Sequence, residues 1–126
     1  MASKTIPLAY IPQNWYMGWT ISTQSASKIC VTLKDSANTY IDNVCKKSTS
    51  FLPPLSTGFQ QVTGTGLAIT IDVPDSKDLD FVVEPYQVCN AAGSAVVQGV
   101  NILLEDASGS GYSDLFASIV AWQAVS

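Results

Sequence analysis

Short runs of β-forming residues recur along the whole chain, and this pattern constrains the fold more than any other feature of the sequence. Clusters of Gly, Pro, Asn, Asp and Ser, which favour turns, separate the runs roughly every ten residues. Such spacing is typical of a β-sandwich, and no long run combines a helical period with a cap. The sequence therefore predicts an all-β fold, a single-domain antiparallel β-sandwich of about nine strands, Greek-key or jelly-roll-like, over residues 1–126.

Alternating apolar residues mark the expected strands. In "YMGWTIS", Met17, Trp19 and Ile21 share one face, and "KICVTLK" alternates in the same way. Trp19 and Trp122 both lie in such runs, so both are expected in the core. The glycines of "TGTG" predict a tight hairpin, and residues 72–80, with four aspartates, predict a solvated hairpin turn. Further strands are expected in "NTYIDNV", "FQQVT", "LAITIDV", "LDFVVEPYQV", "AVVQGVNILL" and "FASIVAW".

Cysteine and histidine usage limits the chemistry of the chain. A chain of 126 residues can bury a core without disulfides. Its cysteines, Cys30, Cys45 and Cys89, are odd in number and form no CxxC pair, and histidine is absent from the sequence. These features argue against a zinc site and an oxidised scaffold, so we expect reduced, buried cysteines. Without histidine, the usual base for a serine or cysteine nucleophile is missing, so we expect no enzyme.

The charge of the chain excludes further classes of protein. The net charge is −4 and every basic residue is lysine, so the basic surface of a nucleic-acid-binding protein is missing. Lys46 and Lys47 are adjacent, and we expect both to be solvated. We expect no transmembrane segment, because every apolar stretch is too short. "MASKTIPLAY" lacks the regions of a signal peptide, which predicts cytoplasmic synthesis and leaves later release or surface association open.

Two segments at opposite ends of the chain resemble a known family when they are taken together. They are "IPQNWYMGWT" and "EDASGSGYSD". Both are similar to motifs of the bacterial calcium-dependent fucose- and mannose-binding lectins, of the fucose-binding lectin II type. In that family L-P-x-N-x-x-F-G-V-T comes first, and E-D-G-x-D-x-D-Y-N-D follows before an apolar strand that ends in Trp. The order of the motifs is the same here, and the resemblance covers nearly the whole chain.

The resemblance implies a fold and an activity. The family has a nine-stranded antiparallel β-sandwich, usually dimeric or tetrameric, and binds sugars through two adjacent calcium ions. By position in the motif, Glu105 matches the first calcium ligand and Asp114 the last. Asp106 matches the aspartate that hydrogen-bonds the sugar.

The chain departs from the family at several ligand positions. Gly109 and Gly111 stand where the family has ligating aspartates, and Ser113 replaces an asparagine. Calcium needs six to eight oxygen ligands, and two adjacent ions need several carboxylates. The resemblance therefore implies a calcium site that is partly or wholly lost. As cofactor we expect none, or one weakly bound calcium held by Glu105, Ser113 and Asp114.

These observations lead to two hypotheses about function. The first is a carbohydrate-binding, lectin-like protein that binds glycans as a homodimer or higher homo-oligomer. The second is a non-catalytic self-assembling structural or toxin-type protein on the same sandwich, in which the acids form only a solvated glycine-rich turn. Under the first hypothesis the expected sugar-binding residues are Asp106, Ser22, Thr23, Gln24, Ser25, Trp15 and Tyr112.

Overall fold

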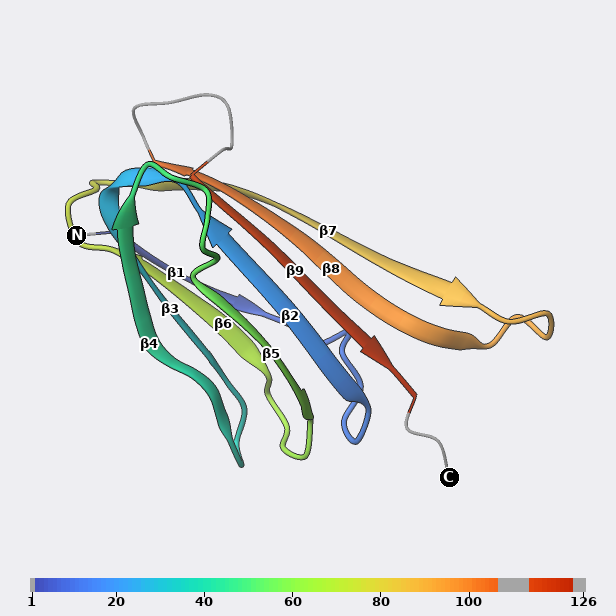
Figure 1. Cartoon of the computed structure of the whole chain (residues 1–126). Helices are drawn as coiled ribbons and strands as arrows, with labels where there is room; N and C mark the ends of the chain where they lie inside the picture. Colours follow the sequence, from blue (N-terminus) through green and yellow to red (C-terminus); the bar gives the residue numbers. More distant parts are fainter. Residues whose placement is uncertain (1, 107–113, 124–126) are drawn as a thin grey trace.

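The computed structural model describes residues 2–106 and 114–123, which form nine β-strands (Figure 1). No helix is present in these two ranges, and so none that is long and apolar enough to cross a membrane. The all-β prediction and the strand number are confirmed. The strands are β1 (Ala2–Pro7), β2 (Tyr16–Thr23), β3 (Ser25–Lys34), β4 (Thr39–Ser48), β5 (Ser56–Gln61), β6 (Ala68–Val73), β7 (Leu79–Cys89), β8 (Ala95–Asp106) and β9 (Leu115–Trp122).

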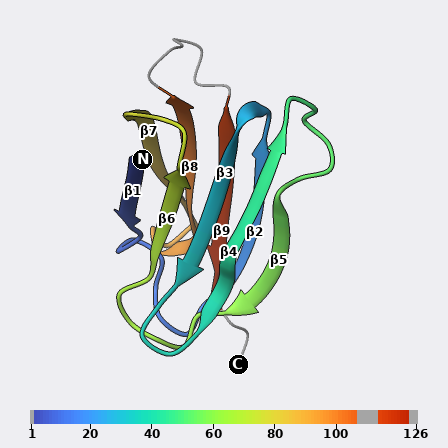
Figure 2. The same cartoon turned by 90° about the vertical axis from the view of Figure 1, so that its left-hand side faces the viewer.

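The strands form two antiparallel sheets that face each other (Figure 2). One sheet has the order β1-β6-β3-β4 and the other the order β5-β2-β9-β8-β7. The chain therefore changes sheets between β5 and β6 and again between β6 and β7. The hairpins predicted at "TGTG" and at residues 72–80 are wrong for this reason, although both segments do contain turns. Gly66 supplies the positive φ, 70°, that the first of these connections needs.

The core lies between the sheets and follows the alternation of the sequence. Met17, Trp19 and Ile21 are all buried, as predicted. Trp122 is not in the core, because β9 pairs with β2 so that Trp122 lies opposite Tyr16 on the outer face of the five-stranded sheet. The small residues of β9 face inward instead and are fully buried; they are Ala117 and Ala121.

Two cysteines form a disulfide, which corrects the prediction of reduced, buried thiols. Cys30 of β3 lies directly opposite Cys45 of β4, with their Cα atoms 4.0 Å apart, and the two sulfur atoms are bonded. Directly opposed residues on antiparallel strands are close enough for such a bridge. Cys89 is a free thiol and is exposed rather than buried.

The β7–β8 hairpin extends beyond the sandwich (Figure 1). All residues from 84 to 94 are exposed, including Pro85, Tyr86 and Val88. β7 is an edge strand, which explains why it tolerates Pro85, since proline has no N–H group to donate to a neighbouring strand. The outer half of this hairpin is therefore largely exposed, although Tyr10 lines a shallow hollow beside Pro85 and Tyr86.

Candidate functional site

The structure brings the two predicted halves of the sugar site together. The turn at residues 22–25, between β2 and β3, contacts the start of β9. The backbone N–H of Gln24 donates a hydrogen bond to the Asp114 carbonyl oxygen at 3.0 Å, and the backbone N–H of Asp114 donates to the Leu104 carbonyl oxygen at 3.1 Å. Thr23 pairs with Leu115 in the same sheet. We call this end of the molecule, which carries residues 22–25 together with Glu105, Asp106 and Asp114, the acidic end.

Three of the four predicted residues in the turn are buried. Ser22, Thr23 and Ser25 are 5%, 1% and 7% exposed, respectively. The Ser25 hydroxyl accepts a hydrogen bond from the Ser27 amide at 3.0 Å, so it supports the turn itself. The Thr23 hydroxyl has no hydrogen-bond partner among the described residues. Gln24 is the member of the four that remains partly exposed, so its side-chain amide is the group best placed to contact a ligand.

The predicted calcium ligands are described only in part. Glu105 is 7% exposed and lies opposite Asp80 of β7, and Asp106 ends β8. Asp114 directly precedes β9. Tyr112 and Ser113, and the glycines of the motif, lie outside the described residues. Among the side chains that are described, no group of three or more His, Cys, Asp or Glu residues is arranged to hold a metal ion.

Lys46 is a feature of the acidic end that the sequence analysis missed. Its ammonium group donates to four backbone carbonyl oxygens, those of Thr23 at 2.9 Å, Ser50 at 2.8 Å, Phe51 at 3.3 Å and Pro53 at 2.7 Å. A lysine ammonium has three N–H donors and no acceptor, so this ring of oxygens uses its full donor capacity. The prediction that Lys46 is simply solvated is wrong.

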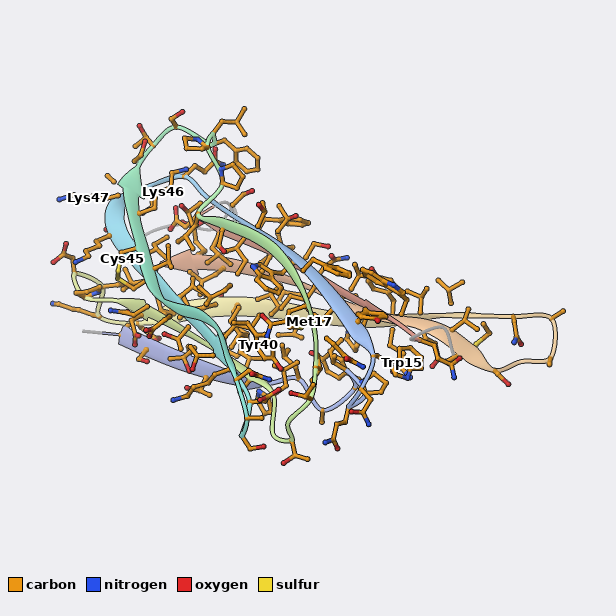
Figure 3. The ribbon with its side chains drawn as sticks, turned by 60° about the horizontal axis from the view of Figure 1, so that its bottom comes forward. Trp15, Met17, Tyr40, Cys45, Lys46 and Lys47 are labelled. Atoms are coloured by element: carbon orange, nitrogen blue, oxygen red, sulfur yellow. A yellow bond between two sulfur atoms is a disulfide. The ribbon has the colours of Figure 1, made fainter. Side chains whose placement is uncertain are left out.

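The position of Lys46 gives the contact a structural role. The residue lies on β4 at the acidic end of the sandwich (Figure 3). Through its ammonium group it joins the β4–β5 connection to the end of β2, next to the turn at residues 22–25. Hydrogen bonds to a charged donor are stronger than those between neutral groups. Lys46 therefore holds one wall of the acidic end in place.

Trp15 lies at the opposite end of the molecule from the predicted sugar site (Figure 3). It precedes β2, whose eight residues separate it from the acidic end by about 25 Å. Its ring is partly buried against the core, and its carbonyl oxygen accepts a hydrogen bond from the Val62 amide at 2.9 Å. Trp15 is thus too distant to stack on a sugar that is bound by Asp106.

A polar network around Asp35 lies at the same end as Trp15, where β3 ends. Its carboxylate accepts hydrogen bonds from the amides of Ala37 at 2.7 Å, Asn38 at 2.8 Å and Gly64 at 3.2 Å, and from the Tyr40 hydroxyl. Burial alone would raise the pKa of Asp35, but these hydrogen bonds outweigh it and lower the pKa. Burial and the neighbouring Asp35 raise the pKa of Tyr40. The network joins the β3–β4 turn to the β5–β6 connection.

Comparison with known proteins identifies the fold through structure and not through sequence. No family model and no curated protein matches the chain. A Ralstonia solanacearum high-affinity mannose-binding lectin matches with a TM-score of 0.66 and 20% identity, over 92% of this chain and 95% of that one. The chain has the fold of a bacterial lectin.

Two further structures agree with this lectin fold. The Chromobacterium violaceum lectin CV2L, solved in complex with alpha-methyl-fucoside, gives a TM-score of 0.65 at 19% identity and covers 92% of this chain and 95% of its own. The C-terminal domain of the BC2L-C lectin from Burkholderia cenocepacia gives 0.62 at 15% identity, with 96% of each chain covered. At these identities the likeness concerns the lectin fold itself.

Proposed function

We propose that the protein is a non-catalytic carbohydrate-binding protein whose sugar site is the acidic end. In this site the Asp106 carboxylate accepts hydrogen bonds from sugar hydroxyl groups, and the partly exposed Gln24 amide contributes a second polar contact. The observation that carries the proposal is the pair of hydrogen bonds from Gln24 to Asp114 and from Asp114 to Leu104. They bring together two segments that are far apart in the sequence and that the family resemblance assigns to one site.

We also propose that the site uses one weakly bound calcium ion at most. Glu105 and Asp114 are the two carboxylates at predicted ligand positions, and two carboxylates fall short of the oxygen set that calcium requires. Lys46 already supplies a fixed positive charge beside the turn, which supports a site that keeps its shape without two dications. If an ion is bound, its role is to order Glu105 and Asp114.

A glycan array, probed once with calcium and once with a chelator, tests both statements. We expect binding to neutral glycans that persists in chelator, and a weaker signal in Asp106→Ala, because the acidic end then no longer contributes. Asp42→Ala is the matched control, because Asp42 is an exposed aspartate on β4 outside the acidic end. Binding that is unchanged in Asp106→Ala would move the site elsewhere, and binding that chelator abolishes would show an essential calcium ion.

We further propose that the protein forms a homodimer or higher homo-oligomer through the exposed part of the β7–β8 hairpin. Tyr86 and Val88 are 40% and 51% exposed there, on a strand at the edge of its sheet, and an edge strand favours pairing with a second chain. Light scattering should show dilution-dependent assembly that Val88→Lys weakens. A monomer at every concentration would contradict this, and assembly without any glycan binding would favour the self-assembling class of protein.

The disulfide supports release of the protein from the cytoplasm after synthesis. Disulfides such as Cys30–Cys45 persist mainly in oxidising compartments. Thiol labelling of protein that is recovered from the cells and from the medium checks this proposal. We expect one reactive thiol per chain, Cys89, in released protein, and three reactive thiols would contradict it.

A further inference from the structure

Three aromatic rings from three strands meet on the outer face of the five-stranded sheet. Tyr16 of β2, Phe59 of β5 and Trp122 of β9 have ring centroids 5.5 to 6.4 Å apart. Phe59 is nearly parallel to both of the others, with angles of 17° to Tyr16 and 25° to Trp122, and it is 61% exposed. We call this region, at the other end of β2 from the acidic end, the aromatic end.

A shallow hollow lies beside these rings. Its volume is about 340 Å³, and its lining includes Gly18, Thr20, Thr57, Ser118 and Trp122. Gly18, which has no side chain, is part of the lining. A Cβ atom at that position would lie 3.6 Å from the Trp122 ring, in ordinary contact, so the indole lies over the glycine and forms one wall.

The lining of the hollow is neutral and has two kinds of chemistry. Trp122 and Val120 supply apolar surface, and Thr20, Thr57 and Ser118 carry hydroxyl groups. No charged residue lines the hollow within the described part of the chain. The hollow therefore offers no positive charge to an anionic ligand. A neutral ligand with one apolar face and several hydroxyl groups matches both the apolar surface and the hydroxyl groups of the lining.

The three hydroxyl groups also argue against a purely apolar ligand or partner surface in the hollow. Covering them with an apolar surface would leave them without partners, which costs roughly 1 to 3 kcal/mol for each group. A ligand that has its own hydroxyl groups avoids this cost. We propose that the hollow is a second carbohydrate site, which binds one pyranose ring of a neutral glycan with its C–H face on Trp122 and its hydroxyl groups on Thr20, Thr57 and Ser118.

The indole N–H signals of the three tryptophans give a direct NMR test. The protein is titrated with the neutral methyl glycosides of mannose, glucose, galactose and fucose, and Trp122→Phe assigns the Trp122 signal. We expect at least one glycoside to shift the Trp122 signal saturably. Gly18→Val fills the hollow while it keeps all three rings, and valine favours strands, so it should weaken binding by about tenfold or more.

Further variants distinguish glycan binding in the hollow from binding at the acidic end and from non-specific hydrophobic binding. Thr20→Val removes one hydroxyl group without changing the size of the side chain and should weaken binding several-fold. Asp106→Ala should leave the Trp122 shift intact, so the two sites can fail independently. Val82→Thr, on the same outer face but on β7, is the control and should have no effect.

Three results would overturn the proposal. The first is a Trp122 signal that none of the four glycosides shifts. The second is a glycoside-induced shift that is unchanged in both Gly18→Val and Thr20→Val. The third is a Trp122 shift that appears on dilution without any glycoside, because this would assign the face to contact between copies of the chain.

Discussion

The two ends of β2 differ in chemistry although β2 and its neighbour β9 contribute to both. The acidic end contains buried hydroxyl residues and the buried Glu105. There the Lys46 ammonium donates to the Thr23 carbonyl oxygen, and backbone hydrogen bonds hold the turn at residues 22–25. At the aromatic end, Tyr16, Phe59 and Trp122 form a neutral surface. A charged side chain, Lys46, therefore stabilises the acidic end. The aromatic end depends instead on ring packing beside Gly18, which has no side chain. The following experiments test this difference.

Lys46→Met should have the largest effect and should act on the acidic end. The variant keeps the aliphatic part of the side chain but leaves four carbonyl oxygens without their charged donor. We expect a loss of about 3 kcal/mol in the free energy of unfolding, because the group is only partly buried and water replaces some of the bonds. Urea denaturation measures this loss. Lys47→Met, at the exposed neighbouring position, should change stability by less than about 0.5 kcal/mol.

Amide hydrogen exchange shows which part of the molecule loses stability in Lys46→Met. Amides of the β4–β5 connection should exchange faster, while those near Tyr16 and Trp122 should change only as much as the global stability does. If amide exchange became faster at both ends by the same amount, beyond the change in global stability, Lys46 would stabilise both ends and not the acidic end alone.

A pair of glycine substitutions should have an intermediate effect at the aromatic end. A Cβ atom at Gly58 would overlap the Trp19 indole, which is 8% exposed and donates a hydrogen bond to the Ser56 hydroxyl at 3.2 Å. Gly58→Ala should therefore cost about 1 to 2 kcal/mol in thermal or urea unfolding. Gly18→Ala should be neutral or slightly stabilising, because its Cβ has room and alanine has less conformational freedom when unfolded. Equal costs would show that Gly18 does not border an open hollow.

A fall in pH should have the smallest effect on the free energy of unfolding. Asp35, at the end of the molecule where β3 ends, should account for part of this effect. Its lowered pKa means that the folded protein binds the proton less tightly than the unfolded chain does. Its contribution to stability is therefore present above about pH 4, the ordinary aspartate value, and is lost as the pH falls through the lowered pKa. The unfolding free energy of Asp35→Asn should depend less on pH across this range. An equal slope in the parent protein and in Asp35→Asn would contradict the assignment.

Sequence patterns predicted the parts of the fold that depend on simple alternation. Met17, Trp19 and Ile21 are buried because an apolar run of period two matches a half-buried strand. The juxtaposition of the turn at residues 22–25 with Asp114 also followed from the sequence, through the resemblance to a lectin family. The first strand was missed because "ASKTIP" has weak alternation and ends in a proline, which its place at a sheet edge tolerates.

Other features depend on pairing that the sequence does not show. In β9 both faces carry apolar residues, so periodicity did not decide whether Trp122 or Ala121 faces the core. The disulfide depends on the register of β3 with β4, which contains irregularities. Lys46 binds backbone carbonyl oxygens, whose directions follow from the path of the loop and not from the side chains in it.

Lys46 also determines how the acidic end responds to its surroundings. An ion that is taken up from solution leaves when its free concentration falls, whereas this ammonium group is covalently part of the chain and its local concentration is constant. The β4–β5 connection should therefore stay in place through dialysis, chelation and dilution.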